Sequence, residues 1–590
     1  MCGIFGFISN NNGFEKVLGK KILENLYKLS ETRGKEASGL MVSNKQEIHV
    51  IKDSIPASEL VKKRVYNKTI DNFLKSDNET CAIGHSRLVT NGSAEDNNNN
   101  QPFYFSGISV VHNGIITNEE SLWKKNLDLD KKSTNLDTEI FTKIFKKNLD
   151  TFSTIEALIK TFESIEGVAN VSILFEKLHT LILTTNNGSL YYAESKKKES
   201  LIFASEKYIL KKCINSVDSK NKFFSIHEIN HIKPNTGVIV NLLSMKKDFF
   251  NFEKKKIIKF EEANKKIIDV SENKELLKGL NNFQSKKKDY SENYENYYKN
   301  REKISKLKRC TRCILPITMP FISFDDQGVC NYCKEYKFYK PKGLNEFKKL
   351  FEKKNENFDC IATFSGGRDS SYGVHVLKKK LNLDFLTFTY DWGMVTDLAR
   401  RNQMRMCGSL GVEHILVSAD IKKKRENIKK NVLAWLKKPE LGMIPLFMAG
   451  DKQYFYWGNK IAKQNSSKKI ILFENLLETT KFKSGFCGIK PIHGTKNTYT
   501  LSLKNKISLI FYYLKNFIRN PSYINSSILD TFSAFFSYYI LDHEWINLFD
   551  YIDWDEDEIN KVLKQNYNWE ISNDTSSTWR IGDGTAAFYN

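Results

Sequence analysis

A repeated strand–turn–helix pattern between residues 358 and 419 constrains the fold of this chain more than any other feature. The apolar stretches FDCIATFS, LDFLTFTY and EHILVSA have the length and the β-branched or aromatic content of buried strands. The stretches between them, YGVHVLKKK and TDLARRNQMRMC, have helical character. Consecutive strands joined by helices run parallel, because each helix carries the chain back to the start of the next strand. The pattern therefore predicts a doubly wound parallel α/β domain, which we expect to occupy residues 346–590.

The turn after the first of these strands reads TFSGGRDSS, at residues 363–371. Its two glycines allow the backbone to approach phosphate oxygens, and the start of the following helix adds N–H donors and a favourable dipole. Its serine hydroxyls can add contacts, and its aspartate can reach a Mg²⁺ that bridges the phosphates of ATP. The spacing is not that of a Walker P-loop. The residues expected at this ATP site are Ser365, Gly366, Gly367, Asp369, Ser370 and Ser371.

The chain begins MCGIFGF, with a cysteine directly behind the initiator methionine. A small second residue normally lets the methionine be removed, which would leave Cys2 with a free α-amino group of pKa about 7.7 to 8.0. A thiol and a near-neutral amine on one residue combine a nucleophile with a proton acceptor. The alternative is a half-buried cysteine at the start of an edge strand.

Four downstream stretches fit a glutaminase. Arg87 is suited to hold the α-carboxylate of glutamine as a bidentate donor, and Asp137 is available for its α-ammonium group. Asn113 and the backbone N–H of Gly114 fit an oxyanion hole for the tetrahedral intermediate. Each residue alone is more typical of an ordinary strand end or turn. The stretches are RGKEASG (33–39), GHSRLVTNG (84–92), HNGII (112–116) and LDTEI (136–140).

Together with Cys2, and in this order, these stretches resemble the class II glutamine amidotransferases, whose catalytic residue is an N-terminal nucleophile. The resemblance extends to about residue 240 and includes FASEKYIL. It implies an αββα sandwich over residues 1–250, with Cys2 as nucleophile, Arg87 and Asp137 as substrate clamps, and Asn113 and Gly114 as the oxyanion hole. One departure affects the expected closure of the glutamine loop: Leu-Val-Thr-Asn follows Arg87, where the sugar-phosphate enzymes usually have Trp-Ala-Thr-His.

Two CxxC pairs follow a stretch rich in Lys, Glu and Asn at 251–304, which we expect to be a linker with some helix. The spacing C-x2-C-x16-C-x2-C is typical of a structural Zn²⁺ site, because two tight turns can offer four thiolates to one tetrahedral ion. A redox pair would not need duplication. We therefore expect a zinc module at 305–345 with the ligands Cys310, Cys313, Cys330 and Cys333.

The net charge of +22 arises from 91 Lys and Arg against 69 Asp and Glu. Much of the excess lies in runs such as EKKKIIKF and KNKISLIFYYLKN, which are typical of solvated surface, so we expect no nucleic-acid partner and a weak attraction to anionic substrates or membrane surfaces. The apolar run ISLIFYYL is cut by Lys515, well short of a membrane span. Without a visible signal peptide or a disulfide framework, the sequence predicts a cytoplasmic protein.

The SGGRDSS turn resembles that of the PP-loop ATP pyrophosphatases, which split ATP into AMP and pyrophosphate by adenylating a carbonyl oxygen. A glutaminase joined to such a domain predicts that ammonia attacks an activated carbonyl. Glutamine-dependent asparagine synthetases have the same domain order but no four-cysteine cluster between the domains. PP-loop enzymes that modify tRNA are a second alternative, although a glutaminase would have no role in their sulfur or lysine chemistry.

Further motifs between 305 and 590 resemble the N-acetyl sugar amidotransferases of surface-polysaccharide biosynthesis, such as the pathways to lipopolysaccharide O-antigen or nonulosonic acids. They are RCTRCILPITMPFISFDDQGVCNYC, FSGGRDSS, TYDWGM, LGMIPLFMAGDKQYFY, ETTKFKSGFCGI and STWRIGDGTAAFYN. The resemblance implies that glutamine, ATP and an acetamido sugar are substrates and that an acetamido group becomes an acetamidino group. Which sugar reacts, whether it is free, nucleotide-linked or lipid-linked, and whether the chain forms a homo-oligomer are left open. Members of this family continue beyond FYN, so truncation at residue 590 is also left open.

Several charged residues in these motifs are candidates for contacts with substrate, Mg²⁺ or phosphate. Asp391 closes the second predicted strand of the parallel sheet. The others are Asp451 and Lys452 of AGDKQ, Lys481 and Lys483 of TTKFKSG, and Arg580 of WRIGDG.

Overall fold

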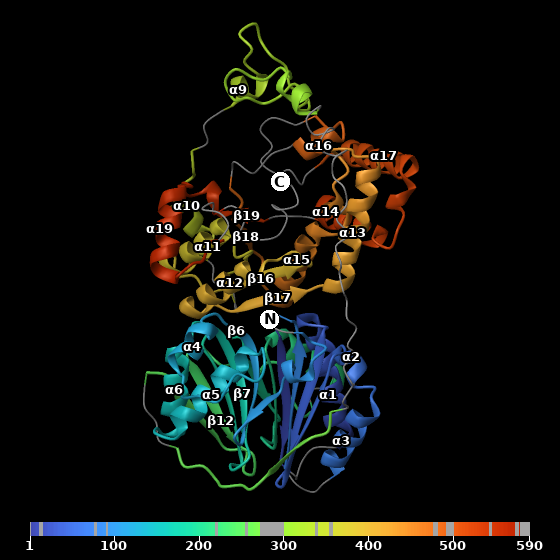
Figure 1. Ribbon diagram of the computed structural model, residues 1–590. Helices are drawn as coiled ribbons and strands as arrows, with labels where there is room; N and C mark the ends of the chain where they lie inside the picture. Colours follow the sequence, from blue (N-terminus) through green and yellow to red (C-terminus); the bar gives the residue numbers. More distant parts are fainter. Residues whose placement is uncertain are drawn as a thin grey trace.

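The computed structural model describes residues 2–10, 16–75, 79–89, 93–218, 222–253, 258–271, 300–336, 340–352, 358–475, 482–490, 501–541, 545–572 and 578. The chain forms three parts that follow one another along the long axis of the molecule (Figure 1). A layered N-terminal unit lies at one end, an α/β unit lies in the middle, and a small part that contains α9 (Asn331–Glu335) lies at the other end.

Two β-sheets stack face to face in the N-terminal unit. The first has the strand order β11-β9-β10-β1-β4-β2-β3-β14, and the second has the order β13-β12-β8-β7-β6-β5. The strands of the first sheet are β1 (Gly3–Ser9), β2 (Ala37–Ser43), β3 (Glu47–Asp53), β4 (Thr80–Arg87), β9 (Tyr191–Glu194), β10 (Ser200–Ala204), β11 (Asn230–His231) and β14 (Lys266–Asp269). Those of the second are β5 (Phe103–Phe105), β6 (Ile108–Ile116), β7 (Gly167–Phe175), β8 (Thr180–Thr185), β12 (Thr236–Asn241) and β13 (Lys247–Asn251).

Strand periodicity explains the layers. Side chains alternate between the faces of a strand, so Ile4 and Ile8 of β1 enter the core between the sheets, where they share one cluster with Val111 and Leu183 of the second sheet. Phe5, on the other face of β1, packs in an outer cluster with the helices α1 (Lys16–Ser30), α3 (Arg64–Lys75) and α7 (Lys207–Val217). The helices α5 (Asp137–Leu149) and α6 (Thr154–Ser164) cover the second sheet in the same way. The unit therefore has four layers in the order αββα. Its short helices are α2 (Ala57–Leu60) and α4 (Glu119–Lys125).

The predicted linker begins later than residue 251. The strand β14 pairs in parallel with β3, with Ile267 opposite Ile48. The neighbouring Lys265 is buried, and its Nζ lies 3.1 Å from Glu79 Oε1. The sequence analysis did not predict this edge strand of the first sheet, because the charged composition of the stretch is typical of a linker. Residues 272–299 of the predicted linker lie outside the described residues.

The middle unit contains a five-stranded sheet in the order β17-β16-β15-β18-β19. All its strand pairs run parallel, as the sequence pattern predicts. One face packs against α11 (Arg368–His375), α12 (Asp397–Leu410) and α19 (Glu556–Tyr567), and the other packs against α13 (Ile421–Lys437) and α15 (Tyr454–Gln464). The strands are β15 (Cys360–Thr363), β16 (Phe385–Asp391), β17 (His414–Ser418), β18 (Ile470–Leu472) and β19 (Ile546–Asn547). The remaining helices are α10 (Leu344–Lys349), α14 (Pro445–Met448), α16 (Phe482–Phe486), α17 (Leu503–Arg519) and α18 (Ile528–Phe535).

The boundary expected at residue 345 differs from the structure, because α10 belongs to the α/β unit. Its Phe347 is fully buried in the same apolar cluster as Cys360 of β15. The N–H of Lys342 also donates to the carbonyl of Asp550, at 3.0 Å. We call this unit, from about residue 340 onward, the C-terminal domain.

The N-terminal unit and the C-terminal domain share a tightly packed boundary. The helix α12 approaches β7 so closely that a Cβ at Gly408 would lie 2.0 Å from the carbonyl oxygen of Gly167. Leu88 and Val168 of the N-terminal unit belong to the same buried cluster as Phe364 of the C-terminal domain. Among the described helices, none combines the length and the hydropathy needed to cross a membrane.

Candidate active sites and cysteine cluster

Cys2 is buried immediately before β1, where its Sγ lies 3.7 Å from the carbonyl oxygen of Leu88. The antiparallel register, with Gly3 opposite Ser86, brings Cys2 beside Arg87 at the end of β4. Burial raises the pKa of the Cys2 thiol above its usual value, against smaller opposing effects of the N-terminal charge, the Leu88 contact and Arg87. The thiol is therefore protonated near neutral pH and needs a base before it can act as a nucleophile.

The RGKEASG stretch holds the backbone of Arg87. A Cβ at Gly34 would lie 2.2 Å from the carbonyl carbon of Arg87, so only glycine fits there. The N–H of Glu36 donates to the Arg87 carbonyl at 3.2 Å, and the Glu36 carboxylate accepts from the N–H of Val89. The guanidinium of Arg87 is buried and donates to Asn100 Oδ1 at 2.8 Å. The arrangement fixes a buried cation next to Cys2.

Asp137 is the first residue of α5, and its carboxylate faces the end of β6. Its Oδ2 accepts from the N–H of Ile116 at 2.8 Å, and its Oδ1 lies 3.6 Å from His112 Nδ1. Burial alone would raise the pKa of Asp137, but His112, the Ile116 N–H and Arg87 together hold it below its usual value. The carboxylate is therefore charged at neutral pH, as an ammonium-binding group must be. The sequence did not single out His112 for this role, because its partner lies 25 residues further along the chain.

Asn113 and Gly114 lie on β6, in the sheet that stacks against β1. The Asn113 side chain is fully buried, and neither its amide nitrogen nor its amide oxygen has a hydrogen-bond partner among the described residues. A buried unpaired amide is costly unless a ligand completes it. The Asn113 carbonyl is held by the side chain of Asn170 at 2.8 Å. Gly114 has φ +157°, and a Cβ there would lie 1.8 Å from the Val168 carbonyl oxygen, so no larger residue fits.

The structure thus gathers Cys2, Arg87 and Asp137, which interact electrostatically, and puts Asn113 on the facing sheet. Residues 85–212 match the family model of a glutamine amidotransferase domain. The N-terminal unit contains a glutamine amidotransferase domain. We call this unit the amidotransferase domain below.

Curated relatives agree with this match. The glutamine–fructose-6-phosphate aminotransferase (isomerizing) of Francisella tularensis subsp. tularensis is 32% identical over 193 residues, which are 32% of this chain and 29% of that protein. The enzyme of the same name from Staphylococcus epidermidis is 28% identical over 252 residues, 41% of this chain and 37% of its own. The chain therefore spans about a third of the length of these relatives. Among solved structures, the glutamine phosphoribosylpyrophosphate amidotransferase from B. subtilis covers 42% of this chain and 49% of its own, at 19% identity and a TM-score of 0.32.

The predicted phosphate loop connects β15 to α11 in the C-terminal domain. Gly366 has φ +77°, and a Cβ there would lie 2.4 Å from the Ala399 carbonyl oxygen, which explains one glycine of the motif. Ser365 Oγ lies 2.9 Å from Ser370 Oγ and accepts from the N–H of Gly367 at 3.3 Å. Ser371 is buried, and its Oγ accepts from Trp569 Nε1 at 3.1 Å. The loop lies at the carboxyl end of a central parallel strand, where α/β sheets bind ligands.

Asp369, the expected Mg²⁺ ligand, is held by neighbouring donors. Its Oδ1 accepts from Trp554 Nε1 at 3.1 Å and from Arg368 Nε at 2.9 Å. The Arg368 guanidinium also lies over the Trp554 ring and pairs with Glu556 at 2.5 Å. These contacts orient the Asp369 carboxylate at the start of α11, and carboxylate oxygen is a preferred ligand type for Mg²⁺. The sequence alone did not identify Trp554 or Glu556 as supports of the loop.

Asp391 ends β16 fully buried and forms an ion pair with Arg400 of α12. This pair lies close to the amidotransferase domain. Burial raises the pKa of Glu36, the residue that binds the Val89 N–H, while Arg400 and Arg87 lower it and Asp391 raises it further. Asp391 therefore belongs to a group of charged residues, with Arg400 and Glu36, that spans both domains.

The remaining charged candidates fall into two groups. Asp451 and Lys452 lie in a short turn (Asp451–Gln453), with 3.7 Å between Lys452 Nζ and Asp451 Oδ2. Beside them, Lys424 Nζ donates to Gln453 Oε1 at 3.1 Å and to Asp530 at 2.5 Å, contacts that the sequence analysis missed. Lys481 and Arg580 lie outside the described residues, and Lys483 is described only as part of the backbone of α16.

The four cysteines of the two CxxC pairs come together in the small part at the far end. Their Sγ atoms lie within 4.8 Å of one another, with 3.9 Å from Cys310 to Cys333 and 3.6 Å from Cys313 to Cys330. Four thiolates about 2.3 Å from one tetrahedral zinc would be about 3.8 Å apart, so the cluster fits this ion. Desolvation raises the pKa of Cys310, but backbone N–H groups around its Sγ lower that pKa to about 6.

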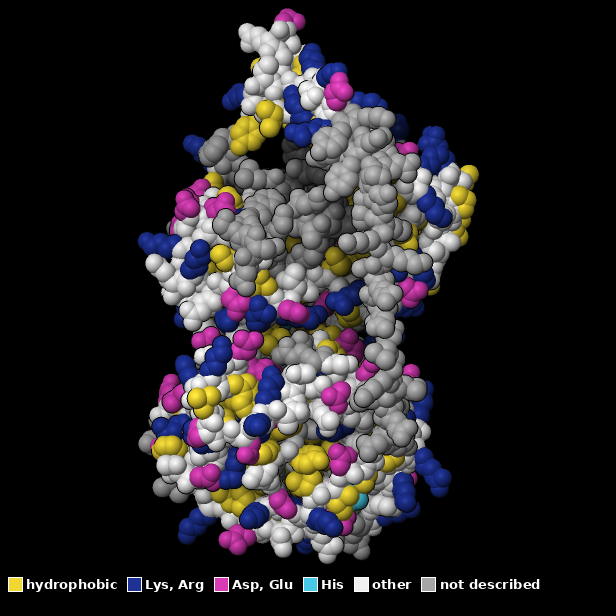
Figure 2. Space-filling view, viewed as in Figure 1, with side chains coloured by type: hydrophobic (Ala, Val, Ile, Leu, Met, Phe, Trp, Pro, Cys, Tyr) yellow, Lys and Arg dark blue, Asp and Glu magenta, His cyan; other side chains and the backbone are white. Residues whose placement is uncertain are grey.

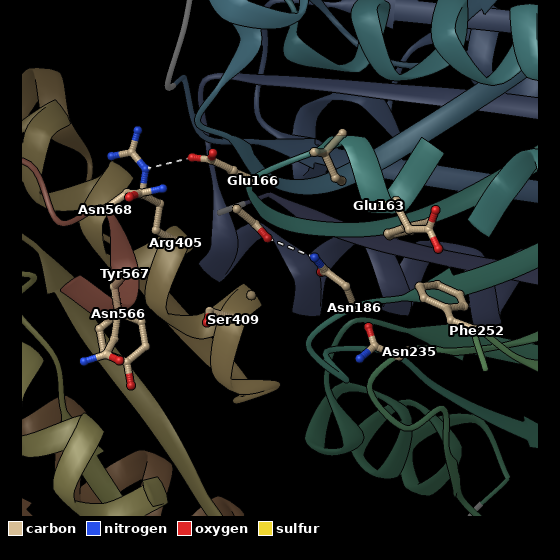
Figure 3. A pocket seen from close by; sticks show the side chains of 14 residues that line it. Glu163, Glu166, Asn186, Asn235, Phe252, Arg405, Ser409, Asn566, Tyr567 and Asn568 are labelled. Atoms are coloured by element: carbon tan, nitrogen blue, oxygen red, sulfur yellow. Dashed lines mark hydrogen bonds and ion pairs between the residues drawn. The ribbon is translucent and has the colours of Figure 1, made fainter. Parts of the chain in front are cut away.

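A separate cavity of about 460 Å³ opens where the two domains meet (Figure 3). Arg405 of α12 points toward Glu166 across it, with 3.5 Å between Nε and Oε2, and Asn186 donates to the Gly167 carbonyl at 2.9 Å. None of the residues predicted for the glutamine or ATP sites lines this cavity. Residues of both domains form its walls.

Proposed function

We propose that this chain is a glutamine- and ATP-dependent amidotransferase that converts an acetamido group of a sugar to an acetamidino group. One observation carries the proposal: the candidate nucleophile and the candidate phosphate loop adjoin the same boundary between the domains. Cys2 contacts the carbonyl of Leu88, and Leu88 packs in one buried cluster with Phe364, the residue before Ser365. Ammonia released at Cys2 would therefore have a short path to the second site.

The glutaminase half of the reaction follows from the groups around Cys2. Arg87 binds the α-carboxylate of glutamine, and Asp137 binds its α-ammonium group. The α-amino group of processed Cys2 accepts the thiol proton, and the thiolate attacks the amide carbon. Asn113 and the Gly114 N–H donate to the oxyanion. The C–N bond then breaks, ammonia leaves with the transferred proton, and water hydrolyses the thioester to glutamate.

The synthetase half uses the loop from Ser365 to Ser371. The loop binds the phosphates of ATP, and the acetamido oxygen attacks the α-phosphorus, so pyrophosphate leaves. Ammonia then adds to the activated carbon, AMP leaves with the oxygen, and an amidinium remains. Asp369 would hold the Mg²⁺, which neutralises phosphate charge. Activation is needed because nitrogen donates into the acetamido carbonyl and makes it a poor electrophile.

The acceptor is inferred from the motifs of residues 305–590, which resemble the N-acetyl sugar amidotransferases. Zn²⁺, bound by Cys310, Cys313, Cys330 and Cys333, would be structural, because four sulfur ligands leave no open position for water. Amidation of a free amino acid such as aspartate is the alternative that the domain order also allows.

Isotope transfer tests this function. The protein is incubated with ATP, Mg²⁺, [amide-¹⁵N]glutamine and a panel of diacetamido sugars, and products are analysed by cation exchange and mass spectrometry. One sugar should gain ¹⁵N and a positive charge, with one AMP formed per product. [α-¹⁵N]Glutamine, the matched control, should leave the product unlabelled. Conversion of aspartate to asparagine in a parallel incubation that also contains aspartate, with no labelled sugar, or formation of ADP, would refute the proposal.

A further inference from the structure

The helices α17 and α18 expose an unusual amount of apolar surface on the outer side of the C-terminal domain. On α17, Ile518 is 80% exposed and Leu503 is 75% exposed. The exposed apolar residues of this helix are Leu503, Ile507, Ile510, Phe511, Leu514 and Ile518. Their spacing of i, i+4, i+7, i+8, i+11 and i+15 puts them on one side of the helix. We call them the α17 stripe.

The opposite side of α17 packs against the rest of the C-terminal domain. The α17 stripe is therefore exposed although the helix itself is firmly packed. Leu509 is buried, and Tyr513 and Phe517 pack against a cluster that contains Met443 and Met448. A Cβ at Gly442 would lie 2.6 Å from the Tyr512 hydroxyl oxygen, which shows how closely this side fits. The domain therefore holds α17 with its apolar stripe facing outward.

The neighbouring α18 continues this surface. Leu529, Phe532, Phe536 and Ile540 of α18 and the π-helical turn that follows it (Phe536–Ile540) are exposed. On the inner side, Ala534 is buried and the Thr531 hydroxyl donates to the Met448 carbonyl at 2.9 Å. In Figure 2, hydrophobic side chains lie along the edge of the molecule where Figure 1 labels α17, with Lys and Arg side chains beside them.

The charges around this surface are mostly positive, although Arg519 pairs with Glu440, which follows α13, at 3.8 Å. Residues 501–541 contain Lys504, Lys506, Lys515 and Arg519, and a single acidic residue, Asp530. Asp530 is paired with Lys424 of α13, which neutralises it. Cationic side chains beside an apolar stripe complement an anionic lipid surface, where the cations meet head groups and the apolar residues enter the acyl boundary. The same charges oppose contact with a second copy of this surface.

We propose that α17 and α18 dock the protein onto the surface of an anionic phospholipid membrane. The 17 residues of α17 form a helix about 25 Å long. Anchored in the domain by its inner side, this helix lies flat on the bilayer and does not cross it. The proposal rests on exposure and charge and does not depend on the reaction the enzyme catalyses.

Vesicle flotation with the full chain tests it. Vesicles of equal parts phosphatidylcholine and phosphatidylglycerol should retain the protein at low salt, and pure phosphatidylcholine should not. The double variant Phe511→Ser/Ile518→Ser should bind about tenfold or more weakly, because apolar burial is lost. The variant Lys504→Gln/Lys515→Gln should also bind weakly and should lose much of the salt dependence.

Leu127→Ser is the matched control, because Leu127 is 87% exposed but lies on the amidotransferase domain. It should bind as the unaltered protein does, and all variants should keep the melting curve of the unaltered protein, which shows that both domains are folded. Failure of the unaltered protein to bind anionic vesicles would overturn the proposal. So would equal binding of the Phe511→Ser/Ile518→Ser variant. A dimer in light scattering that this variant dissociates would assign the surface to a second copy instead.

Discussion

The residue that most distinguishes the candidate glutamine site is Asn113, because its buried amide has no partner among the described residues. An amide that serves only to fill the core would be paired within the protein. Asn170 illustrates the contrast, since its side chain bridges the Asn113 carbonyl and the Thr185 hydroxyl. We infer that the partner of Asn113 is the oxyanion formed from glutamine.

Asn113→Ala should lower kcat for glutamine hydrolysis by about 10² to 10³. KM should change little, because the donor acts chiefly in the transition state. Thermal stability should be nearly unchanged, since no internal hydrogen bond is lost. The measurement is steady-state glutaminase kinetics together with a melting curve. A large loss of stability with normal kcat would show that Asn113 is a structural residue.

A second residue-scale prediction concerns acid stability. His85 is fully buried with no side-chain hydrogen-bond partner among the described residues, and burial, with smaller effects of Arg87 and His112, lowers its pKa to about 3. An unfolded histidine titrates near 6.5. The unfolded chain therefore binds more protons below pH 6.5, so His85 lowers the free energy of unfolding by ~1.4 kcal/mol per pH unit as the pH falls toward 3.

Replacing His85 by Gln removes this titration. Between pH 7 and pH 5, the unaltered protein should lose ~2 kcal/mol more stability than His85→Gln. Urea unfolding of both proteins across this range, followed by the fluorescence of the amidotransferase domain, measures the difference. Parallel pH profiles would contradict the prediction.

At the scale of elements, the sequence was most informative where periodicity is strong. The strand–helix repeats after residue 358 predicted the parallel sheet, and the resemblance of the motifs around Cys2 to class II glutamine amidotransferases implied the αββα layers. The strand β14 was missed because its pairing with β3 depends on residues more than 200 positions away, and its Lys-rich composition resembles a linker. The site contacts that were missed, such as Trp554 with Asp369 and Asp530 with Lys424, are likewise long-range.

The contact between α12 and β7 gives a prediction at this scale. Gly408→Ala would put a Cβ against the Gly167 carbonyl, so the two domains must separate locally. We expect a lower melting temperature and release of ammonia that escapes transfer, measured as more glutamate than AMP per turnover. Ser409→Ala is the control and should keep the ratio near one, because Ser409 lines the cavity between the domains and its replacement adds no atom at the close contact. An unchanged ratio in Gly408→Ala would show that the close contact does not couple the sites.

The cysteine cluster gives another prediction at the scale of elements. Elemental analysis should find about one zinc per chain, and replacing any one of Cys310, Cys313, Cys330 and Cys333 by Ser should increase proteolysis around residues 305–345, because metal binding contributes to folding there. Cys487→Ser is the control, since Cys487 lies outside the cluster. Absence of zinc, or an iron–sulfur absorption band, would contradict the assignment.

At the scale of the whole molecule, the proposed reaction requires two sites that work separately but share one boundary. Cys2 lies on the amidotransferase side and the Ser365–Ser371 loop lies in the C-terminal domain. The charged group of Glu36, Arg400 and Asp391 reaches across this boundary. A nucleophile needed only to release ammonia should be dispensable when ammonia is supplied directly.

The most direct test is therefore Cys2→Ala assayed for AMP formation with the acceptor sugar. With glutamine as nitrogen source the variant should be inactive, because no thioester can form. With ammonium chloride it should form AMP and product at a rate close to that of the unaltered protein. Asp369→Ala should show the reverse pattern, with glutamine hydrolysis retained and AMP formation lost. If folded Cys2→Ala were inactive with ammonium as well, the two-site account would be wrong.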